Sequence, residues 1–305
     1  MKILMTGAYG FVGTNLCKFL VAKGHQCHAL DVPAAKRDEV PYASFHTWDE
    51  LDAVFAGGAY DAIVHLAGKA HDLKKVSSPQ SYFDINVGLT QKIFTAASGK
   101  VPRFIYFSSI KALDGDTPYA QSKRAAEAWL KEQASATRIV ALEPAMIHGP
   151  GNKGNLNLLV QVVRKGIPWP LAAFENHRSF TSIGNICAVV EALAAVPHDA
   201  TGFDAYQAFP MCDDTPVSTN RLIELIAEAY GRKARLLKLP KGLMRAAASL
   251  GTVLHLPLNT ERLGKLTEDS VVDNAAIKHA LGWDKMPVAA EDGLRATLAS
   301  FAQEV

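Results

Sequence analysis

The chain has 305 residues, of which 49% are hydrophobic and 20% are charged, a balance typical of a globular protein with a large core. Its 32 Lys and Arg residues against 30 Asp and Glu residues leave a net charge of +2, which gives no reason to expect a nucleic-acid surface or a polybasic membrane anchor. The four cysteines lack the short paired spacing of zinc or redox motifs, so we expect reduced thiols and a cytoplasmic protein.

The sequence contains no run of 18 consecutive apolar residues and therefore predicts no membrane-spanning helix. One stretch, residues 243–258, nevertheless carries an apolar stripe at helical spacing. The stripe consists of Met244, Ala247, Leu250, Val253 and Leu254. Two interpretations are open: a helix packed on the core, which we favour, and a helix that lies on a membrane surface.

The first 150 residues alternate short β-rich runs with helical stretches, the order that produces a parallel sheet with helices on both faces. Runs such as Ala62-Ile63-Val64 are apolar without alternation, as expected of strands that are covered on both faces. We predict strands over residues 2–6, 26–31, 62–66, 104–108 and 138–142. We predict helices over residues 11–23, 81–97 and 119–133.

Beyond residue 150 the pattern becomes irregular, with Gly and Pro interrupting it at 166–168 and again near 213–216. We therefore predict two domains. The first spans residues 1–150, and residues 179–195 return to it. The second spans most of residues 151–305. The expected fold class is α/β, a doubly wound parallel sheet with a smaller, mixed C-terminal domain for the substrate.

The segment from Thr6 to Gly13, Thr-Gly-Ala-Tyr-Gly-Phe-Val-Gly, joins the first predicted strand to the first helix. Glycines here permit a tight turn and a close approach of the backbone to a pyrophosphate, while the amides at the helix N-terminus face the anion. Asp31 ends the second strand 18 residues later, where its carboxylate can bond the ribose hydroxyls. We predict a Rossmann-type dinucleotide site that includes Gly7, Gly10, Phe11, Val12, Gly13 and Asp31.

The charge of Asp31 favours NAD, because a carboxylate repels the additional phosphate of NADP. Lys36 and Arg37 follow soon after, and either of them would suit such a phosphate if it turned toward the site. An exposed charged loop is the better interpretation of these two residues. NAD is therefore the predicted cofactor, and NADP is the alternative.

Tyr119 and Lys123 lie four residues apart at the start of a predicted helix, hence on one face. A neighbouring ammonium favours the phenolate of a tyrosine, whose ordinary pKa is about 10. Ser109 follows the strand over 104–108, at the edge where doubly wound folds bind ligands. Its hydroxyl can orient a reacting carbonyl or alcohol. Together with the glycine turn, these features predict Ser109, Tyr119 and Lys123 as catalytic residues.

These motifs, together with His65-Leu66-Ala67-Gly68 and with Asn86 and Thr90, stand in the order seen in extended short-chain dehydrogenases. Over nearly its whole length the chain resembles the branch called NAD-dependent epimerase/dehydratase. Within that branch it is similar to bacterial sugar-nucleotide 4-epimerases and 4-keto-reductases that serve surface-polysaccharide assembly. The resemblance implies an enzyme that acts at carbon 4 of a nucleotide-diphosphate sugar, most often linked to UDP.

The resemblance also implies site residues. Cofactor contacts would come from Leu66, Ala67, Tyr119, Lys123, Pro144 and Ile147. Substrate contacts would come from Ser109, Tyr119, Arg178, Asn155 or Asn157, and Arg262, with Arg178 at the diphosphate. His71 is either a further substrate contact or a polar loop residue. The chain departs from the family pattern at Glu143, where many relatives carry arginine.

The favoured function is a UDP-4-keto-hexosamine 4-reductase. The alternatives are a UDP-hexose or UDP-N-acetylhexosamine 4-epimerase with bound NAD, and a non-catalytic NAD(P)-binding sensor or scaffold. Ile110 and Lys111 stand where sugar dehydratases carry an Asp-Glu pair, which argues against dehydration. The His, Cys, Asp and Glu residues have no metal-ligand spacing, so we predict no metal. The sequence leaves open whether the chain forms a homodimer.

Overall fold

The computed structural model describes residues 1–56, 60–70, 78–133, 137–152, 154, 156–197, 204–256 and 258–303. The chain divides into two compact units. Unit 1 comprises Met1–Ala145, Ile183–Cys212 and Asp273–Pro287, and unit 2 comprises Met146–Ser182, Asp213–Val272 and Val288–Val305. The sequence placed the boundary at residue 150 and a single return at 179–195. The chain instead leaves unit 1 after Ala145 and returns to it twice.

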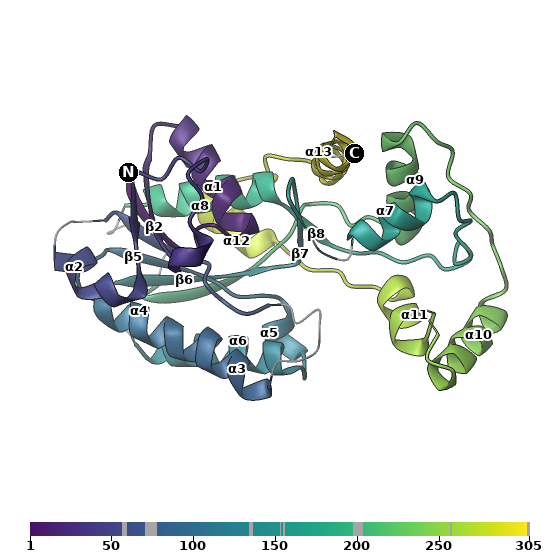
Figure 1. The fold of residues 1–305 in the computed structure, drawn as a ribbon, viewed down its shortest axis with the longest axis horizontal. Coiled ribbons are helices and arrows are strands. Elements are labelled where there is room, and N and C mark those ends of the chain that lie inside the picture. Colours follow the sequence, from purple (N-terminus) through teal and green to yellow (C-terminus); the bar gives the residue numbers. More distant parts are fainter. Residues whose placement is uncertain are drawn as a thin grey trace. The chain divides into compact units, whose positions relative to one another are not determined.

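A parallel sheet forms the centre of unit 1, and its strands follow the order β3-β2-β1-β4-β5-β6-β9 (Figure 1). The strands are β1 Lys2–Thr6, β2 Gln26–Leu30, β3 Ser44–His46, β4 Ala62–His65, β5 Arg103–Phe107, β6 Arg138–Pro144 and β9 Tyr206–Met211. Every pairing in it is parallel. The order reverses direction between β1 and β4, the place where doubly wound sheets bind ligands. The predicted fold class is confirmed.

Helices cover both faces of this sheet. They are α1 Phe11–Ala22, α2 Leu51–Ala56, α3 Pro79–Phe83, α4 Thr90–Ala97, α5 Lys111–Asp114, α6 Pro118–Glu132, α8 Ile183–Ala195 and α12 Ala275–Leu281, with short 3₁₀ turns at Pro33–Ala35 and Trp48–Glu50. In Figure 1, α1 and α8 lie on one face and α4 and α6 on the other. Side chains of α2, α4 and α6 pack on the apolar runs of the strands, including Ile63 of β4 and Phe104 of β5. This burial of apolar surface stabilises the sheet.

The helix predicted over 81–97 is broken into three parts. A π-helical turn, Asp84–Leu89, separates α3 from α4. It contains Asn86, which is 1% exposed and whose side chain accepts from the Lys69 backbone N–H at 2.7 Å and donates to the Lys69 carbonyl at 3.0 Å. These bonds aim Asn86 into the protein at the point where the helix widens, and such widened turns often occur at functional sites.

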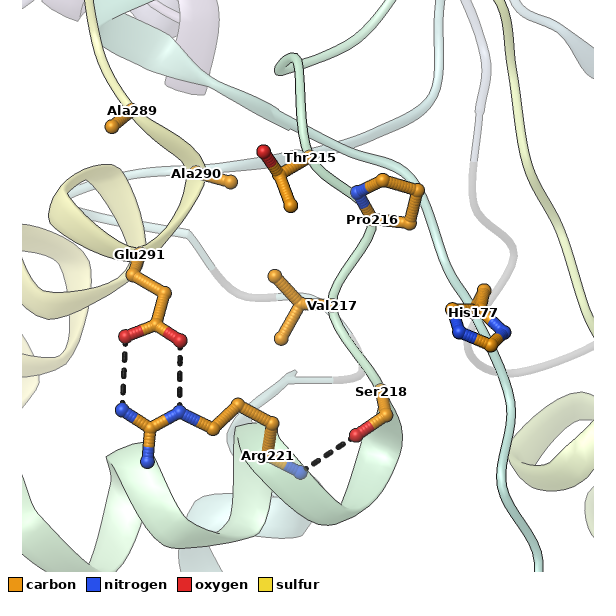
Figure 2. A pocket seen from close by; sticks show the side chains of 9 residues that line it. All are labelled: His177, Thr215, Pro216, Val217, Ser218, Arg221, Ala289, Ala290 and Glu291. Carbon is orange, nitrogen blue, oxygen red and sulfur yellow. Dashed lines mark hydrogen bonds and ion pairs between the residues drawn. The ribbon is translucent and has the colours of Figure 1, made fainter.

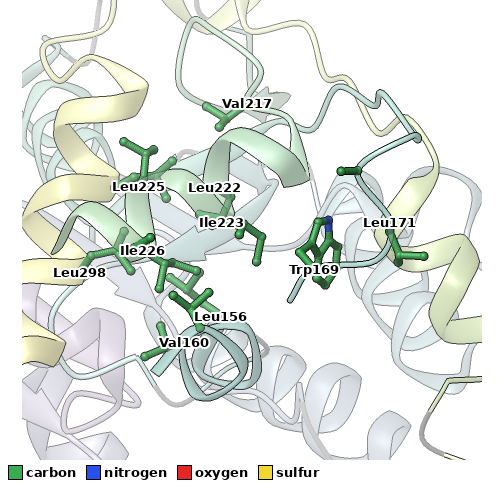
Figure 3. Packing of buried hydrophobic residues seen from close by; sticks show 14 of the residues in the cluster. Leu156, Val160, Trp169, Leu171, Val217, Leu222, Ile223, Leu225, Ile226 and Leu298 are labelled. Atoms are coloured by element: carbon green, nitrogen blue, oxygen red, sulfur yellow. The ribbon is translucent and has the colours of Figure 1, made fainter. Parts of the chain in front are cut away.

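Unit 2 contains a two-stranded parallel sheet, β7 Met146–His148 with β8 Phe180–Ser182. Its helices are α7 Leu156–Arg164, α9 Thr219–Ala229, α10 Lys241–Val253, α11 Thr260–Thr267 and α13 Ala290–Gln303. Figure 3 shows their common core, in which Leu222 and Ile226 of α9 lie among Leu156 and Val160 of α7 and Leu298 of α13.

Residues 243–258 include helix α10, which packs on the core as the favoured interpretation expected, but not through most of the predicted stripe. Of the predicted stripe, Met244 is buried, whereas Leu250, Val253 and Leu254 are exposed by 58%, 73% and 57%. The helix therefore packs through Met244, Ala248 and Gly251 and has a second apolar face that the core does not cover. Among the described residues, no helix combines the length and the hydropathy needed to cross a bilayer.

Candidate active site

The glycine turn after β1 fits closely against the loop that follows β4. Gly7 has a φ of +60°, and a Cβ on it would lie 2.7 Å from the amide nitrogen of Ala67 and 2.8 Å from its Cα. A Cβ on Gly13 would collide with the carbonyl of Ala8. The turn is therefore closely packed through its glycines at the start of α1, where the amides of a helix N-terminus form the kind of cradle into which a pyrophosphate fits.

Asp31 lies directly beside this turn. Its carboxylate accepts the backbone N–H of Tyr9 at 3.2 Å and that of Val32 at 2.8 Å, and the residue is 8% exposed. The structure thus brings together the two halves of the predicted cofactor motif. Lys36 is exposed and pairs with Asp38 at 3.6 Å, which agrees with a charged loop rather than a phosphate contact.

The loop after β4 is fixed by Thr6, a residue that sequence reasoning did not assign to the site. The backbone N–H of Leu66 donates to the Thr6 carbonyl at 3.2 Å, and that of Ala67 donates to the Thr6 hydroxyl at 3.1 Å. His65 is buried between the hydroxyls of Thr6, at 2.6 Å, and Thr90, at 2.9 Å. Burial lowers the pKa of His65 to about 3, so this histidine is neutral and its role is structural.

Two capping residues set the start of helix α6. Thr117 accepts the backbone N–H of Ala120 at 3.2 Å and Pro118 occupies the first helical position, which places Tyr119 in the first turn. Burial raises the pKa of Tyr119, and a side-chain hydrogen bond with Ser109 lowers it again in part. Tyr119 and Ser109 thus meet at the carboxyl end of β5, as the sequence predicted.

Lys123 lies one turn further along α6 and is 5% exposed. Its Nζ donates to the Phe107 carbonyl at 2.7 Å and lies 4.7 Å from the centroid of the Tyr106 ring. Burial lowers the pKa of Lys123 to about 8. The sequence argument expected this ammonium to lower the pKa of Tyr119. The structure instead directs it at a strand-end carbonyl, while the pKa of Tyr119 is raised.

Asn86 connects these parts. Its amide donates to the hydroxyl of Ser122 on α6 at 2.8 Å, in addition to its bonds with Lys69. A Cβ on the neighbouring Gly68 would lie 3.0 Å from the Asn86 side-chain oxygen and 3.2 Å from the Lys123 Nζ. The loop after β4, the π turn and α6 therefore converge on Lys123. The order of motifs in the sequence named Asn86, but its contacts could be seen only in the folded chain.

A pair of acidic side chains lies beside this group. Glu127 follows Lys123 by one helical turn and accepts a hydrogen bond from the Ser108 hydroxyl. It also shares a hydrogen bond with Glu143 on β6, which is 2% exposed. Burial and the charge of Glu127 raise the pKa of Glu143 to about 8. The two carboxyl groups therefore hold one proton between them at neutral pH.

The remaining predicted residues that the structure describes in this group lie on α1, β6, β7 and α7. Phe11 and Val12 are half-buried in the first turn of α1, and Pro144 is buried at the end of β6. Ile147 lies on β7 of unit 2. Asn157 donates to the Asn152 carbonyl at 2.9 Å, a bond that fixes the start of α7. His71 and Asn155 lie outside the described residues.

Arg178 and Arg262 both belong to unit 2. The Arg178 guanidinium donates to the carbonyl of Lys265 in the last turn of α11, where a cation stabilises the helix end. Burial lowers the pKa of Arg178, and Glu268 raises it. Arg178 thus makes a structural bond to a helix carbonyl and has Glu268 as an acidic neighbour. Arg262 is exposed in the first turn of α11.

Unit 2 also contains a hollow of about 400 Å³ (Figure 2). It is lined by His177, Thr215, Pro216, Val217, Ser218, Arg221, Ala289, Ala290 and Glu291. The Arg221 guanidinium is held by Glu291 through two bonds of 2.8 and 2.9 Å, so its charge is already neutralised. None of the predicted site residues lines this hollow.

Comparison with known proteins gives a consistent result. The model of the NAD dependent epimerase/dehydratase family matches residues 3–207. The chain is 30% identical to a UDP-glucose 4-epimerase of Vibrio cholerae, with 99% of this chain and 96% of the relative aligned. It is 24% identical to an N-acetyl-alpha-D-glucosaminyl-diphospho-ditrans,octacis-undecaprenol 4-epimerase of Escherichia coli O157:H7, over 78% of this chain and 75% of that relative.

Among solved structures, the enzyme WbmG of Bordetella bronchiseptica in complex with NAD and UDP superposes with a TM-score of 0.72 at 19% identity, over 99% of this chain and 94% of the other. At that identity the likeness supports the fold. The family match supports more than the fold, because it confirms the predicted NAD cofactor and favours an enzyme over a non-catalytic sensor. The chain belongs to the NAD dependent epimerase/dehydratase family.

Proposed function

We propose that the chain is an NAD-dependent 4-epimerase of a UDP-linked sugar. The observation that carries the proposal is the convergence of Ser109, Tyr119 and Lys123 at the carboxyl end of β5, next to the glycine cradle. The similarity to the Vibrio cholerae UDP-glucose 4-epimerase along almost the whole chain supports the choice of reaction. Epimerisation therefore takes precedence over the reduction that the sequence alone favoured.

The residues of unit 1 suit the two proton transfers that this reaction needs. Tyr119 would take the proton of the sugar 4-hydroxyl and later return it, while the Ser109 hydroxyl holds the oxygen in place. Lys123 would keep a positive charge beside this group and reach the cofactor ribose. NAD, bound by the cradle and by Asp31, supplies reversible hydride transfer at carbon 4. Nearly all the specificity for the sugar must then come from other residues.

We propose unit 2 as the source of substrate contacts. Arg178 and Arg262 are the candidates for the diphosphate, and Asn157 is a candidate for a further polar contact with the substrate. A guanidinium can bond two phosphate oxygens at once. The half-buried setting of Arg178 strengthens such a contact, because a charge in a less polar environment interacts over a larger effective range. Its bond to Lys265 already orients the side chain.

Reduction of a UDP-4-keto-hexosamine is the second candidate, and the pKa of Tyr119 favours it. Burial keeps this phenol protonated, which is the form that donates a proton to a keto oxygen. A reductase needs only that step, whereas an epimerase must also remove the proton. The same three residues would serve both reactions.

The test is incubation of the purified chain with UDP-glucose, UDP-N-acetylglucosamine and UDP-4-keto sugars, with and without added NADH. The panel includes N-acetylglucosaminyl-diphospho-undecaprenol, because the Escherichia coli relative is named for that substrate. Interconversion of 4-epimers without net consumption of NADH supports the epimerase. Stoichiometric oxidation of NADH with a keto sugar supports the reductase. Turnover of none of these substrates by the NAD-bound chain would refute both.

The state of the four cysteines also indicates the cellular compartment in which the protein works. All four, Cys17, Cys27, Cys187 and Cys212, are buried free thiols. Such thiols persist in a reducing compartment. We therefore propose that the enzyme works in the cytoplasm.

A further inference from the structure

Helix α10 has two apolar faces, and only one of them is packed. Met244, Ala248 and Gly251 face the protein, and a Cβ on Gly251 would collide with the carbonyl of Leu258. The other face, called here the outer face, consists of Leu243, Ala246, Ala247, Leu250, Val253 and Leu254, all of them exposed. In a helix of 3.6 residues per turn these positions share one side.

The outer face is unusual for a surface in contact with water. Leu243 and Leu250 are each 58% exposed and Val253 is 73% exposed. Single exposed aliphatic residues are common, but a contiguous group of them marks a surface that contacts another apolar body.

The charges around α10 indicate what that body is. Residues 229–260 contain six cations, Arg232, Lys233, Arg235, Lys238, Lys241 and Arg245, and no Asp or Glu. All six are exposed, and two of them, Arg232 and Arg235, donate to the Arg164 and Gly166 carbonyls at the end of α7. The whole chain has a net charge of only +2, so this segment holds a local excess that the overall balance conceals. Lys241 and Arg245 lie on α10 itself, on the flank between its two apolar faces.

We propose that α10 docks this protein on an anionic lipid bilayer, with the outer face in the boundary between headgroups and acyl chains and the cations at the headgroups. An apolar face flanked by Lys and Arg is the pattern of helices that lie in the plane of a membrane. With 13 residues, α10 has a length of about 20 Å, too short to cross a bilayer of about 30 Å. The helix lies on the membrane and does not span it.

Two features favour lipid over protein as the occupant. A second copy of this chain docking through the same face would bring two sets of six cations together, which opposes association. The outer face is also purely aliphatic, whereas the anchor positions of protein interfaces are enriched in Trp, Tyr and Arg. Acyl chains require no directional contacts, and anionic headgroups match the charge. The inference goes beyond the proposed reaction and does not depend on it.

The test uses the purified full chain and vesicles of phosphatidylcholine, with or without phosphatidylglycerol. In co-sedimentation, the chain should bind the vesicles that contain phosphatidylglycerol, and added salt should weaken this binding. The double variant Leu250→Gln with Val253→Gln should bind at least about tenfold more weakly, because it loses two inserted aliphatic side chains. The matched control, Leu158→Gln with Val271→Gln, removes two exposed aliphatic residues of unit 2 outside α10 and should bind like the wild type.

A label reports insertion directly. Since the four native cysteines are buried, Val253→Cys provides a selective site for an environment-sensitive dye, whose emission should shift to the blue on vesicles that contain phosphatidylglycerol. The same dye on Val271→Cys should not shift. Equal vesicle binding by a folded Leu250→Gln and Val253→Gln double variant would overturn the proposal. So would self-association of the wild type in sedimentation velocity that this double variant abolishes, because the outer face would then be an interface between copies.

Discussion

The acidic pair beside Lys123 provides the sharpest test of the site's electrostatics. Glu143 is 2% exposed and shares a hydrogen bond with Glu127, and burial together with the charge of Glu127 raises the pKa of Glu143 from its ordinary 4.5 to about 8. Replacing Glu143 by glutamine keeps the shape and a hydrogen-bond donor but removes the acid. The glutamine side chain imitates the protonated carboxyl that the pair holds at neutral pH.

The sign of the pH effect follows from linkage. Between about pH 4.5 and 8 the folded chain holds a proton that the unfolded chain releases, so Glu143 contributes full stability below pH 4.5 and progressively loses it as the pH rises to about 8. At about 1.4 kcal/mol for each pKa unit, the loss is at most about 5 kcal/mol. Because the proton is shared with Glu127 and the site can relax, we expect about 2 kcal/mol.

The assay is urea denaturation of the wild type and Glu143→Gln at several values between pH 5 and 8.5. The difference between the two cancels the contributions of other groups, including His65. The variant should have a similar free energy of unfolding near pH 5 and exceed the wild type by about 2 kcal/mol at pH 8.5. Glu132→Gln, at an exposed position at the end of α6, the helix that carries Glu127, is the control and should show no such trend. A constant difference between Glu143→Gln and the wild type across this range would refute the shared proton.

Four further predictions test other parts of the site, and one of them compares two substitutions. Tyr119→Phe should leave folding and NAD binding intact and lower turnover at least about a hundredfold, so near-normal turnover would remove Tyr119 from the mechanism. Asp31→Ala should reduce the preference for NAD over NADP about tenfold in cofactor titrations, and an unchanged ratio would assign the ribose to another residue. Gly7→Ala and Gly24→Ala both strain a left-handed backbone by about 1–2 kcal/mol, but only at Gly7 does the new methyl meet the Ala67 backbone, so only that variant should also lose NAD affinity. Arg178→Lys should weaken binding of the UDP-sugar by roughly 1.5–3 kcal/mol, whereas a lower Tm with unchanged affinity would limit Arg178 to its bond with α11.

The strands of the sheet were largely predictable where burial is complete. Residues 3–5 and 62–64 form continuous apolar runs, and the observed β1 and β4 agree with the predictions to within one residue. Two strands were missed for physical reasons. β3, Ser44–His46, is three half-buried residues long, and β9, Tyr206–Met211, contains Pro210 and alternates in burial. Their positions at the two edges of the sheet come from pairing with neighbours and not from local pattern.

The candidate site was predictable to the extent that it is local in sequence. The glycine turn is read from spacing within eight residues, and Tyr119 and Lys123 share a helix face. What Lys123 contacts was not predictable, because the Phe107 carbonyl belongs to a strand 16 residues earlier and meets α6 only after packing. The same limit applied to α10: its period predicted a helix, but the choice between its two apolar faces depended on how it packs against the rest of unit 2.

Position 143 shows how one departure from a family pattern changes the physics of a site without changing its fold. An arginine there would neutralise Glu127 with a charge that does not titrate below pH 12. A glutamate at the same place, equally buried, can satisfy Glu127 only by donating a proton. The contact between β6 and α6 then titrates near neutral pH. Because Glu127 also raises the pKa of Lys123, loss of the shared proton increases the negative charge beside the catalytic ammonium and favours its charged form. Position 143 thus places beside Lys123 a buried acid whose charge responds to pH near neutrality.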